Sequence, residues 1–315
     1  MSAEALSCPR RPKSVLSIAG SDSSGGAGIQ ADIKTIEALG LYAQTAITAL
    51  TAQNTTGVSA VAATEPSMVA AQIDAVFADI VPDAVKVGMV PSGDVARAIV
   101  DRLRAHGACN VVVDPVMVAT SGAALADKGA VSAELFGMAT VVTPNIPEAE
   151  ALLGRVTRRE CRIASEDDAE HAARALAEHF GCAFLVKGGH GAHDANDVLV
   201  TPAGDVCWLR AKRVDNPNTH GTGCTLSSAI ACGLAQGLGL AAAVEGAKKY
   251  LDGCLRAYLD LGHGSGRSHV AVLLIESPVL ASWRRITTYK LTGETNCALA
   301  LFVSLFAYLR PPLLF

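Results

Sequence analysis

The sequence alternates short apolar runs with longer amphipathic segments, and this alternation constrains the fold more than any other feature. The short runs have the length and composition of buried strands, whereas the longer segments carry apolar residues at helical spacing. The expected strands are residues 15–19, 43–52, 58–63, 84–87, 111–113, 140–143, 183–187, 198–201 and 206–210. Repeated strand–helix units of this kind predict an α/β fold with a mostly parallel central sheet and helices on both faces.

The helical segments between these strands are recognised by their spacing and by their end signals. The first carries Ile29, Ile33 and Ile36 on one face and is followed by Gly40, a plausible C-terminal cap. The other expected helices begin at Pro66 or span residues 94–105, 165–180, 222–237 and 240–261. Residues 202–205 separate two strands as in an antiparallel hairpin, and residues 155–163 are expected to form a variable loop.

The chain shows no internal repeat and no linker-like change of composition, which favours one domain. We expect a flexible N-terminal tail over residues 1–13, a single α/β domain over 14–270 and an atypical C-terminal tail over 271–315. The apolar stretch 298–309 in that tail is shorter than the roughly 20 residues that a membrane-spanning helix needs. A docked helix and a non-native end remain open as explanations of this tail.

Composition excludes several classes of protein. The net charge of -4 gives no electrostatic reason to expect a nucleic-acid partner, and no basic run suggests a membrane surface. The 9 cysteines are scattered without the spacing of a zinc site. Because the sequence also shows no secretory signal, we expect a cytoplasmic protein with reduced thiols.

Polar and glycine residues cluster where the predicted strands end. Gly20, Gln53 and Met89 follow three early strands, while Asp114 and Lys187 end two later ones. Ligands of doubly wound sheets bind beyond the carboxyl ends of the strands. The combination is more informative than any single member, and it predicts a ligand site at this edge of the sheet.

The glycine-rich segment 219–224 is the strongest candidate for binding phosphate. A glycine turn directly before a helix leaves backbone N–H groups pointing outward, and the helix dipole favours an anion there. Cys224 lies at the start of this helix, a position that favours a thiolate. A P-loop motif and a dinucleotide fingerprint are both absent from the sequence.

Three further residues have competing interpretations. Lys187 could pair with phosphate or simply be a surface lysine before a loop. Asp114 and Glu148 could hold a magnesium shell, since carboxylates are preferred Mg²⁺ ligands. Glu148 could instead interact with the dipole at the start of a short helix after Pro147.

The motifs together resemble the ribokinase-like superfamily and, within it, the bacterial hydroxymethylpyrimidine and phosphomethylpyrimidine kinases of thiamine biosynthesis. The resemblance rests on AGSDSSGGAGIQADIKT from Ala19, ALTAQNTTGV from Ala49, KVGM from Lys86, DPVM from Asp114, TPNIPEAE from Thr143, VKGGH from Val186 and NTHGTGCTLSSAIA from Asn218. These segments occur in order between about residues 14 and 263. Most of the superfamily has aspartate where this chain has Cys224, whereas the pyrimidine kinases are similar to this chain.

The resemblance implies a ribokinase-like fold, an ATP- and Mg²⁺-dependent kinase and a site with four groups of residues. It assigns the pyrimidine pocket to Gly20, Ala27, Gln53, Met89, Val116 and His220. It assigns ATP binding to Asn145, Lys187 and Thr219, and metal binding to Asp114 and Glu148. It assigns catalysis to Cys224, Lys187 and the anion hole of Gly221, Thr222 and Gly223. Asp32 is given no role, and a homodimer is expected from the resemblance alone.

Three alternative functions stay open on the sequence. A pyridoxal kinase shares the fold and the cysteine. A hydrolase with Cys224 as nucleophile and His220 as its base would leave Asp114, Asn145 and Glu148 unexplained. A ligand-binding domain without catalysis could use the same fold.

Overall fold

The computed structural model describes residues 11–116, 133–188, 194–216 and 220–257. Thr219, the predicted C-terminal tail and most of the predicted N-terminal tail lie outside these ranges, as does the domain boundary expected at residue 270. Within the described ranges, no helix is both long and apolar enough to cross a membrane.

The strands form one nine-stranded sheet in the order β3-β2-β1-β4-β5-β6-β7-β8-β9. They are β1 Ser14–Asp22, β2 Tyr42–Asn54, β3 Gly57–Ala63, β4 Ala84–Val87, β5 Val111–Val113, β6 Val141–Val142, β7 Ala183–Lys187, β8 Asp197–Val200 and β9 Val206–Leu209. The six strands from β2 to β7 run parallel, while β3, β8 and β9 are antiparallel additions at the two edges. The predicted mostly parallel sheet and the predicted hairpin are therefore confirmed.

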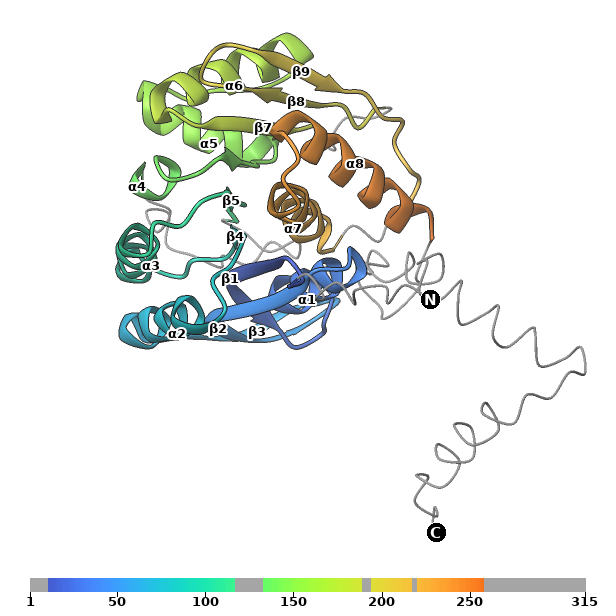
Figure 1. Ribbon diagram of the computed structural model, residues 1–315. Coiled ribbons are helices and arrows are strands. Elements are labelled where there is room, and N and C mark those ends of the chain that lie inside the picture. The colour runs from blue at the N-terminus through green and yellow to red at the C-terminus, as the bar shows by residue number, and fades with distance from the viewer. Residues whose placement is uncertain (1–10, 117–132, 189–193, 217–219, 258–315) are drawn as a thin grey trace, which may run out of the picture. The chain divides into compact units, whose positions relative to one another are not determined.

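Helices cover both faces of this sheet (Figure 1). One layer contains α1 Gly28–Ala38, α7 Thr222–Ala235 and α8 Leu240–Arg256. The other contains α2 Pro66–Asp79, α3 Gly93–Ala105, α4 Ala133–Phe136, α5 Ile146–Thr157 and α6 Glu166–Phe180. The strand order reverses on either side of β1, because the chain winds outward from β1 to β2 and then returns to β4. Such a switch point opens a crevice at the carboxyl ends of the strands.

The core between the sheet and the α2–α6 layer is apolar. Leu16, Val85 and Val113 point into it from the strands, and Ile73 and Ile99 meet them from α2 and α3. All five are at most 1% exposed. Because alternate residues of a strand face opposite sides, the residues between them are directed toward α1 and α7.

The predicted loop at residues 155–163 is wrong in part, since α5 runs to Thr157. Its start is fixed by Asn145, which accepts a hydrogen bond from the Glu148 amide, while the Glu148 carboxylate accepts one from the Asn145 amide. This reciprocal capping box satisfies two amides that a helix start leaves unpaired. Arg158 then ends the helix in the left-handed conformation. The short helix α4 had no counterpart among the sequence-based expectations.

Candidate active site

The first turns of α1 and α7 meet at the carboxyl edge of the sheet. Gly221 precedes α7 with a φ of 83°, in the left-handed region that glycine favours. A Cβ atom at Gly221 would lie 1.9 Å from the carbonyl oxygen of Gly26, so only glycine allows this approach. α7 begins at Thr222 without a side-chain cap from Gly221, and its first residues, Thr222 and Gly223, are those assigned to the predicted anion hole.

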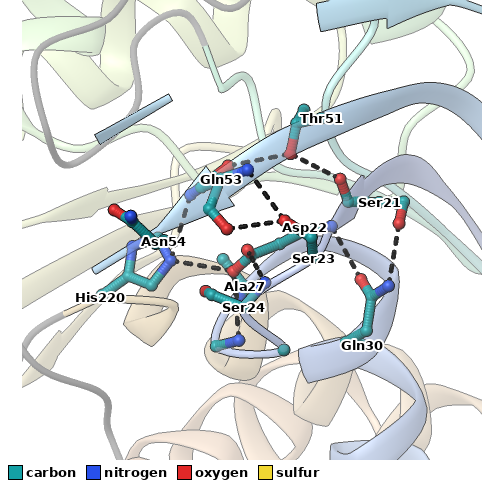
Figure 2. Close-up of polar contacts among 12 residues, drawn as sticks. Ser21, Asp22, Ser23, Ser24, Ala27, Gln30, Thr51, Gln53, Asn54 and His220 are labelled. Carbon is teal, nitrogen blue, oxygen red and sulfur yellow. Dashed lines mark hydrogen bonds and ion pairs between the residues drawn. The ribbon is translucent and has the colours of Figure 1, made fainter. Parts of the chain in front are cut away.

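Asp22 organises the loop that joins β1 to α1 (Figure 2). Its carboxylate accepts hydrogen bonds from the amides of Ser24, Gly26 and Ala27, at 2.8, 3.1 and 2.8 Å. His220 approaches the same carboxylate with Nε2 at 3.0 Å. Burial alone would raise the pKa of Asp22, but the hydrogen bonds from His220 and Ser24 lower it to about 2. The sequence-based assignment missed Asp22, although it lies inside the motif that begins at Ala19.

Gln53 and His220 lie side by side, as predicted for the pyrimidine pocket. The Gln53 Nε2 and His220 Nε2 atoms are 3.3 Å apart, and Figure 2 shows the two side chains beside the Asp22 loop. The hydroxyl of Ser23 accepts a hydrogen bond from the Gln53 amide and donates one to its carbonyl. A cavity of about 400 Å³ adjoins Gln53 at the β2–β3 turn, and Gln53 is the one predicted site residue among those that line it.

Gly20 and Met89 form a second part of the predicted pocket. A Cβ atom at Gly20 would lie 2.7 Å from the Met89 sulfur, so glycine at position 20 makes room for this side chain. The hydroxyl of Thr48 donates to the Met89 carbonyl at 2.7 Å and fixes the segment after β4. Val116 lies just beyond Asp114, after β5, and is half-buried.

Lys187 and Asp114 meet in front of α7. The Lys187 ammonium lies 3.0 Å from the Asp114 carboxylate, and this pair is largely buried. A Cβ atom at Gly223 would lie 3.2 Å from the Asp114 carboxylate and 3.5 Å from the Lys187 ammonium. The predicted cation, carboxylate and anion hole are therefore brought together by β5, β7 and α7.

Glu148 and Asn145 lie next to this group. An isolated bridge joins Asn145 to Lys187, so the end of β6 lies beside the end of β7. Burial alone would lower the pKa of Lys187, but the carboxylates of Asp114 and Glu148 raise it above its ordinary value. The ammonium of Lys187 therefore stays charged. Glu148 also caps the start of α5, which matches its interpretation as a partner of the helix start, whereas its role in holding magnesium stays a prediction.

The donor chemistry fits Mg²⁺. Within the described ranges, no group of three or more histidine, cysteine or acidic side chains could hold a metal. Mg²⁺ is usually held by one or two carboxylates together with substrate phosphates and water. Asp114 and Glu148 supply two carboxylates beside the predicted phosphate site, which is compatible with that mode of binding.

The predicted thiolate at Cys224 is wrong for neutral pH. Burial raises the pKa of the Cys224 thiol to about 11, and the nearby Lys86 ammonium only partly opposes this effect. The sequence indicated a helix start, which favours a thiolate, but it could not show how the surrounding elements desolvate this thiol, although Cys224 is only partly buried by solvent exposure.

Comparison with known proteins identifies the family. The family model for phosphomethylpyrimidine kinase matches residues 22–269. The hydroxymethylpyrimidine/phosphomethylpyrimidine kinase of Rhizobium meliloti is 50% identical over 263 residues, which cover 81% of this chain and 95% of that protein. A thiamine biosynthesis bifunctional protein of Geobacter sulfurreducens is 49% identical over 257 residues, 80% of this chain, and the match spans only 51% of that longer protein.

Solved structures match over most of the chain as well. The Bacillus subtilis pyridoxal kinase in an ADP complex superposes with a TM-score of 0.76 at 31% identity, and the match covers 84% of this chain and all of that one. The phosphomethylpyrimidine kinase of Clostridium difficile superposes with a TM-score of 0.65 at 41% identity, over 76% and 98% of the two chains. The strand order, the converging helix starts and these matches agree, and the chain belongs to the phosphomethylpyrimidine kinase family.

Proposed function

We propose that this kinase uses ATP to phosphorylate 4-amino-5-hydroxymethyl-2-methylpyrimidine and then its monophosphate, giving the diphosphate used in thiamine biosynthesis. The observation that carries the proposal is the meeting of Lys187 and Asp114 at the first turn of α7, beside the α1 loop. The names of relatives up to 50% identical over nearly their whole length support the same substrates.

In the proposed complex, the pyrimidine occupies the space between the Asp22 loop and Met89. The Gln53 amide offers both a donor and an acceptor, which suits an aminopyrimidine edge. Ser23 holds the Gln53 backbone through two hydrogen bonds, while the side-chain oxygen accepts one from the Thr51 hydroxyl at 3.3 Å and the side-chain nitrogen lies 3.3 Å from His220. Gly20, Ala27 and Val116 complete the apolar walls, and His220 is held by Asp22 close enough to contact the substrate or its phosphate.

In the proposed reaction, the hydroxymethyl oxygen attacks the γ-phosphorus of ATP while the bond to the β–γ bridging oxygen breaks. The N–H groups of Gly221, Thr222 and Gly223 would stabilise the charge on the transferred group, and Lys187 would neutralise the phosphate oxygens. Asn145 and Thr219 would contact the nucleotide. Since the second acceptor is already a phosphate oxygen, the second transfer needs less help with deprotonation.

Mg²⁺ would be held by Asp114 and Glu148 and would neutralise charge on the phosphates. Lys187 lies 3.0 Å from Asp114, so its ammonium stands beside a carboxylate that would hold the metal, close to the phosphate site. Cys224 would accept or relay the hydroxyl proton. Its raised pKa means that it holds its own proton at neutral pH and must pass that proton on before it accepts another.

The extent of the domain, the location of the protein and its assembly are proposals as well. A kinase domain over residues 14–270 is supported by a family match that covers residues 22–269. A cytoplasmic location is proposed from the scattered cysteines and the sequence's lack of a secretory signal, and a homodimer is proposed from the resemblance. Sedimentation equilibrium of the purified protein tests the dimer, since a single monomeric species would contradict it.

Pyridoxal is the strongest alternative acceptor, because a pyridoxal kinase superposes with a higher TM-score than the pyrimidine kinase does, 0.76 against 0.65. Sequence identity instead favours the pyrimidine as the acceptor, because it is 41% to the pyrimidine kinase and 31% to the pyridoxal kinase. A hydrolase with a cysteine nucleophile is not favoured, since such enzymes need a thiolate and burial raises the pKa of Cys224 to about 11.

The test is a comparison of three acceptors with ATP and Mg²⁺: the hydroxymethylpyrimidine, its monophosphate and pyridoxal. We expect kcat/KM for the pyrimidine to exceed that for pyridoxal by at least about 10-fold, roughly what one or two mismatched contacts in a pocket cost. Preferential turnover of pyridoxal would replace the proposed substrate, and absence of ATP turnover with all three would remove the proposal.

A pair of lysine variants links that activity to the site. Lys187→Met removes the ammonium beside Asp114 and should lower kcat by at least ~100-fold, as loss of one charge-stabilising group does. Lys249→Met is the control, because Lys249 is exposed on α8 and forms an ion pair with Glu245, one helical turn earlier. Equal activity of the two variants would contradict the assignment of Lys187.

A further inference from the structure

Besides the pair at Lys187, two lysine–aspartate pairs of the described residues are buried on the side of the sheet that α1, α7 and α8 cover. Lys86 of β4 and Asp32 of α1 are both 0% exposed, with the ammonium 2.8 Å from the carboxylate. Lys248 of α8 and Asp197 of β8 lie 2.5 Å apart, and their side chains are 17% and 4% exposed. Because removing such charges from water costs several kcal/mol each, stability alone is a weak reason for a buried pair.

The two aspartates differ in what else they bind. The Asp32 carboxylate accepts its other hydrogen bonds from two serine side chains. The Asp197 carboxylate accepts one from the backbone N–H of Gly188, at 2.9 Å. Gly188 directly follows Lys187, the cation predicted to bind phosphate. Asp197 therefore contacts the backbone of the predicted site itself.

Asp197 and Lys187 also face the same layer of helices. The two residues lie opposite each other in the antiparallel pairing of β7 with β8. Directly opposite residues of such a pair point to the same face of the sheet. Their neighbours Val186 and Val198 lie in the apolar core on the other face, so the two charged side chains are directed toward α7 and α8.

The turn after β7 is held closely on both sides. A Cβ atom at Gly188 would lie 1.9 Å from the carbonyl oxygen of Asn196, so the two backbones touch there. The amide of Lys187 donates to the Pro144 carbonyl at 2.9 Å. The backbone that carries the Lys187 side chain is thus fixed by the end of β6 on one side and by β8 on the other.

Lys248 fixes the Asp197 carboxylate from α8. Its ammonium donates to Asp197 Oδ2 at 2.5 Å and to the Ala195 carbonyl at 2.7 Å, while Oδ1 accepts from the Gly188 amide. Each carboxylate oxygen therefore has its own donor, which restricts rotation of the side chain. Because Lys248 neutralises Asp197, this carboxylate competes less with Asp114 for the Lys187 ammonium.

We propose that Asp197, fixed by Lys248, is a positioning residue that sets the place of the Lys187 ammonium through the Gly188 amide. The effect on catalysis rests on the proposed role of Lys187 in phosphoryl transfer, whereas the hydrogen bond to Gly188 does not. Neither Asp197 nor Lys248 touches a substrate in this account, and no covalent bond to either is made or broken.

The test compares two double variants that differ in one hydrogen-bond acceptor. Both carry Lys248→Met, so that neither leaves a buried charge unpaired. Asp197→Asn keeps an oxygen for the Gly188 amide, whereas Asp197→Ala removes it. We expect kcat of the alanine variant to fall at least about 10-fold, and kcat of the asparagine variant to stay within about 3-fold of the wild type. KM for the pyrimidine should not change, because β5 and β6 separate the predicted pocket at Met89 and Gln53 from β7.

The same alanine variant in a Lys187→Met background distinguishes positioning from a general structural role. If Asp197 acts through Lys187, its removal should cost less than about 2-fold in kcat once Lys187 is gone. An equal loss in both backgrounds would overturn the proposal, and so would equal kcat of the alanine and asparagine variants. Asp205→Ala is the control, because Asp205 is exposed at the turn of the same hairpin and accepts from the Thr201 hydroxyl, and kcat should not change.

Hydrogen exchange of the Gly188 amide, followed by NMR, measures the contact without any activity. Exchange should be at least about 10-fold faster in the alanine variant than in the asparagine variant. Unchanged exchange would contradict the assigned hydrogen bond. Where the alanine variant does not fold, Asp197→Leu with Lys248→Met replaces it, since apolar side chains can substitute for a buried ion pair.

The two proposals fail separately. If Lys187→Met leaves kcat unchanged while the alanine variant speeds exchange at Gly188, the proposed role of Lys187 is wrong and the hold of Asp197 on the turn stands. If Lys187→Met lowers kcat and the alanine and asparagine variants behave alike, only the role of Asp197 is wrong.

Discussion

On β4, Val85 and Val87 point into the apolar layer beneath α2 and α3, whereas Lys86 between them points toward α1 and α7. The two faces of the same strand thus bury different kinds of side chain, apolar on one face and charged on the other. Side chains on the α2–α6 face interact through non-directional packing, so each position accepts residues of similar size. The α1–α7 face also buries apolar residues such as Val112 and Ile230, but it adds directional contacts, in which Ser17 and Ser228 donate hydrogen bonds to Asp32.

The predicted site lies on one side of the sheet because the helices on that side begin there. α1 and α7 both begin at the carboxyl edge, and the close approach of Gly221 to Gly26 brings their first turns together. Helix starts carry partial positive charge, which attracts phosphate. The α2–α6 layer supplies the rigid support, and its own contribution to the site is Asn145 and Glu148 at the start of α5.

The largest expected difference between the two faces comes from Lys86→Met alone. This change leaves the Asp32 carboxylate buried without its cation and should lower the free energy of unfolding by about 3–5 kcal/mol. Adding Asp32→Asn should restore most of the loss, because both charges are then gone. Urea unfolding of the two variants checks this, and equal stability of the single and double variants would break the comparison.

Ile99→Ala tests the apolar face. Ile99 lies on α3 and is 0% exposed, so its truncation should cost roughly 3 kcal/mol through lost burial and a residual cavity. Turnover per folded molecule should not change, since the cavity lies on the opposite side of the sheet. Ile33→Ala is the control, because Ile33 on α1 is 36% exposed. A fall in kcat for the folded Ile99 variant would show that the two faces are not independent.

Gly221→Ala tests the meeting of the two helix starts. The added Cβ would clash with the Gly26 carbonyl and should separate the two turns, lowering kcat/KM by about 100-fold. Gly237→Ala is a close control, since Gly237 at the other end of α7 has a φ of 86° and nothing within 4 Å of the added atom. The Gly237→Ala variant should therefore suffer only the backbone strain, and its kcat/KM should not change. Similar kinetic losses in both variants would mean that strain, and not position, explains the effect.

The smallest expected effect is the loss of folding stability at acid pH that follows protonation of Asp22. Because folding lowers its pKa from 3.8 to about 2, ionised Asp22 stabilises the fold at any pH above about 4. This contribution, about 1–2 kcal/mol, is lost as the pH falls from 4 to 2. The difference in unfolding free energy between the wild type and Asp22→Asn should shrink over that range. A difference that stays constant down to pH 2 would contradict the assigned hydrogen bonds.

The sequence predicted the fold well because the signals are local. The runs that became β5 and β7 have the expected bounds, since short apolar segments between turn residues leave few alternatives. The end of α5 was misjudged because Arg155 and Thr157 are polar and interrupt the apolar spacing, whereas the helix continues through them and ends at Arg158.

The site was predicted less completely because its remaining features depend on contacts between distant residues. Lys86 is 54 positions from Asp32, so its complete burial could not be inferred from the motif that contains it. The thiolate predicted at Cys224 failed for the same reason, since burial by surrounding elements outweighs the helix start. Asp22 could have been predicted, because it ends a strand and precedes a glycine-rich loop, a position of the kind that the other chosen residues have.

The most direct test of the account is the number of ATP molecules consumed for each pyrimidine. Phosphorus NMR of the purified chain with the hydroxymethylpyrimidine, ATP and Mg²⁺ separates monophosphate, diphosphate and ADP. We predict two ADP for each pyrimidine and a diphosphate that forms after the monophosphate. A reaction that stops at the monophosphate with one ADP would contradict the second transfer, and absence of any phosphorylated pyrimidine would contradict the account as a whole.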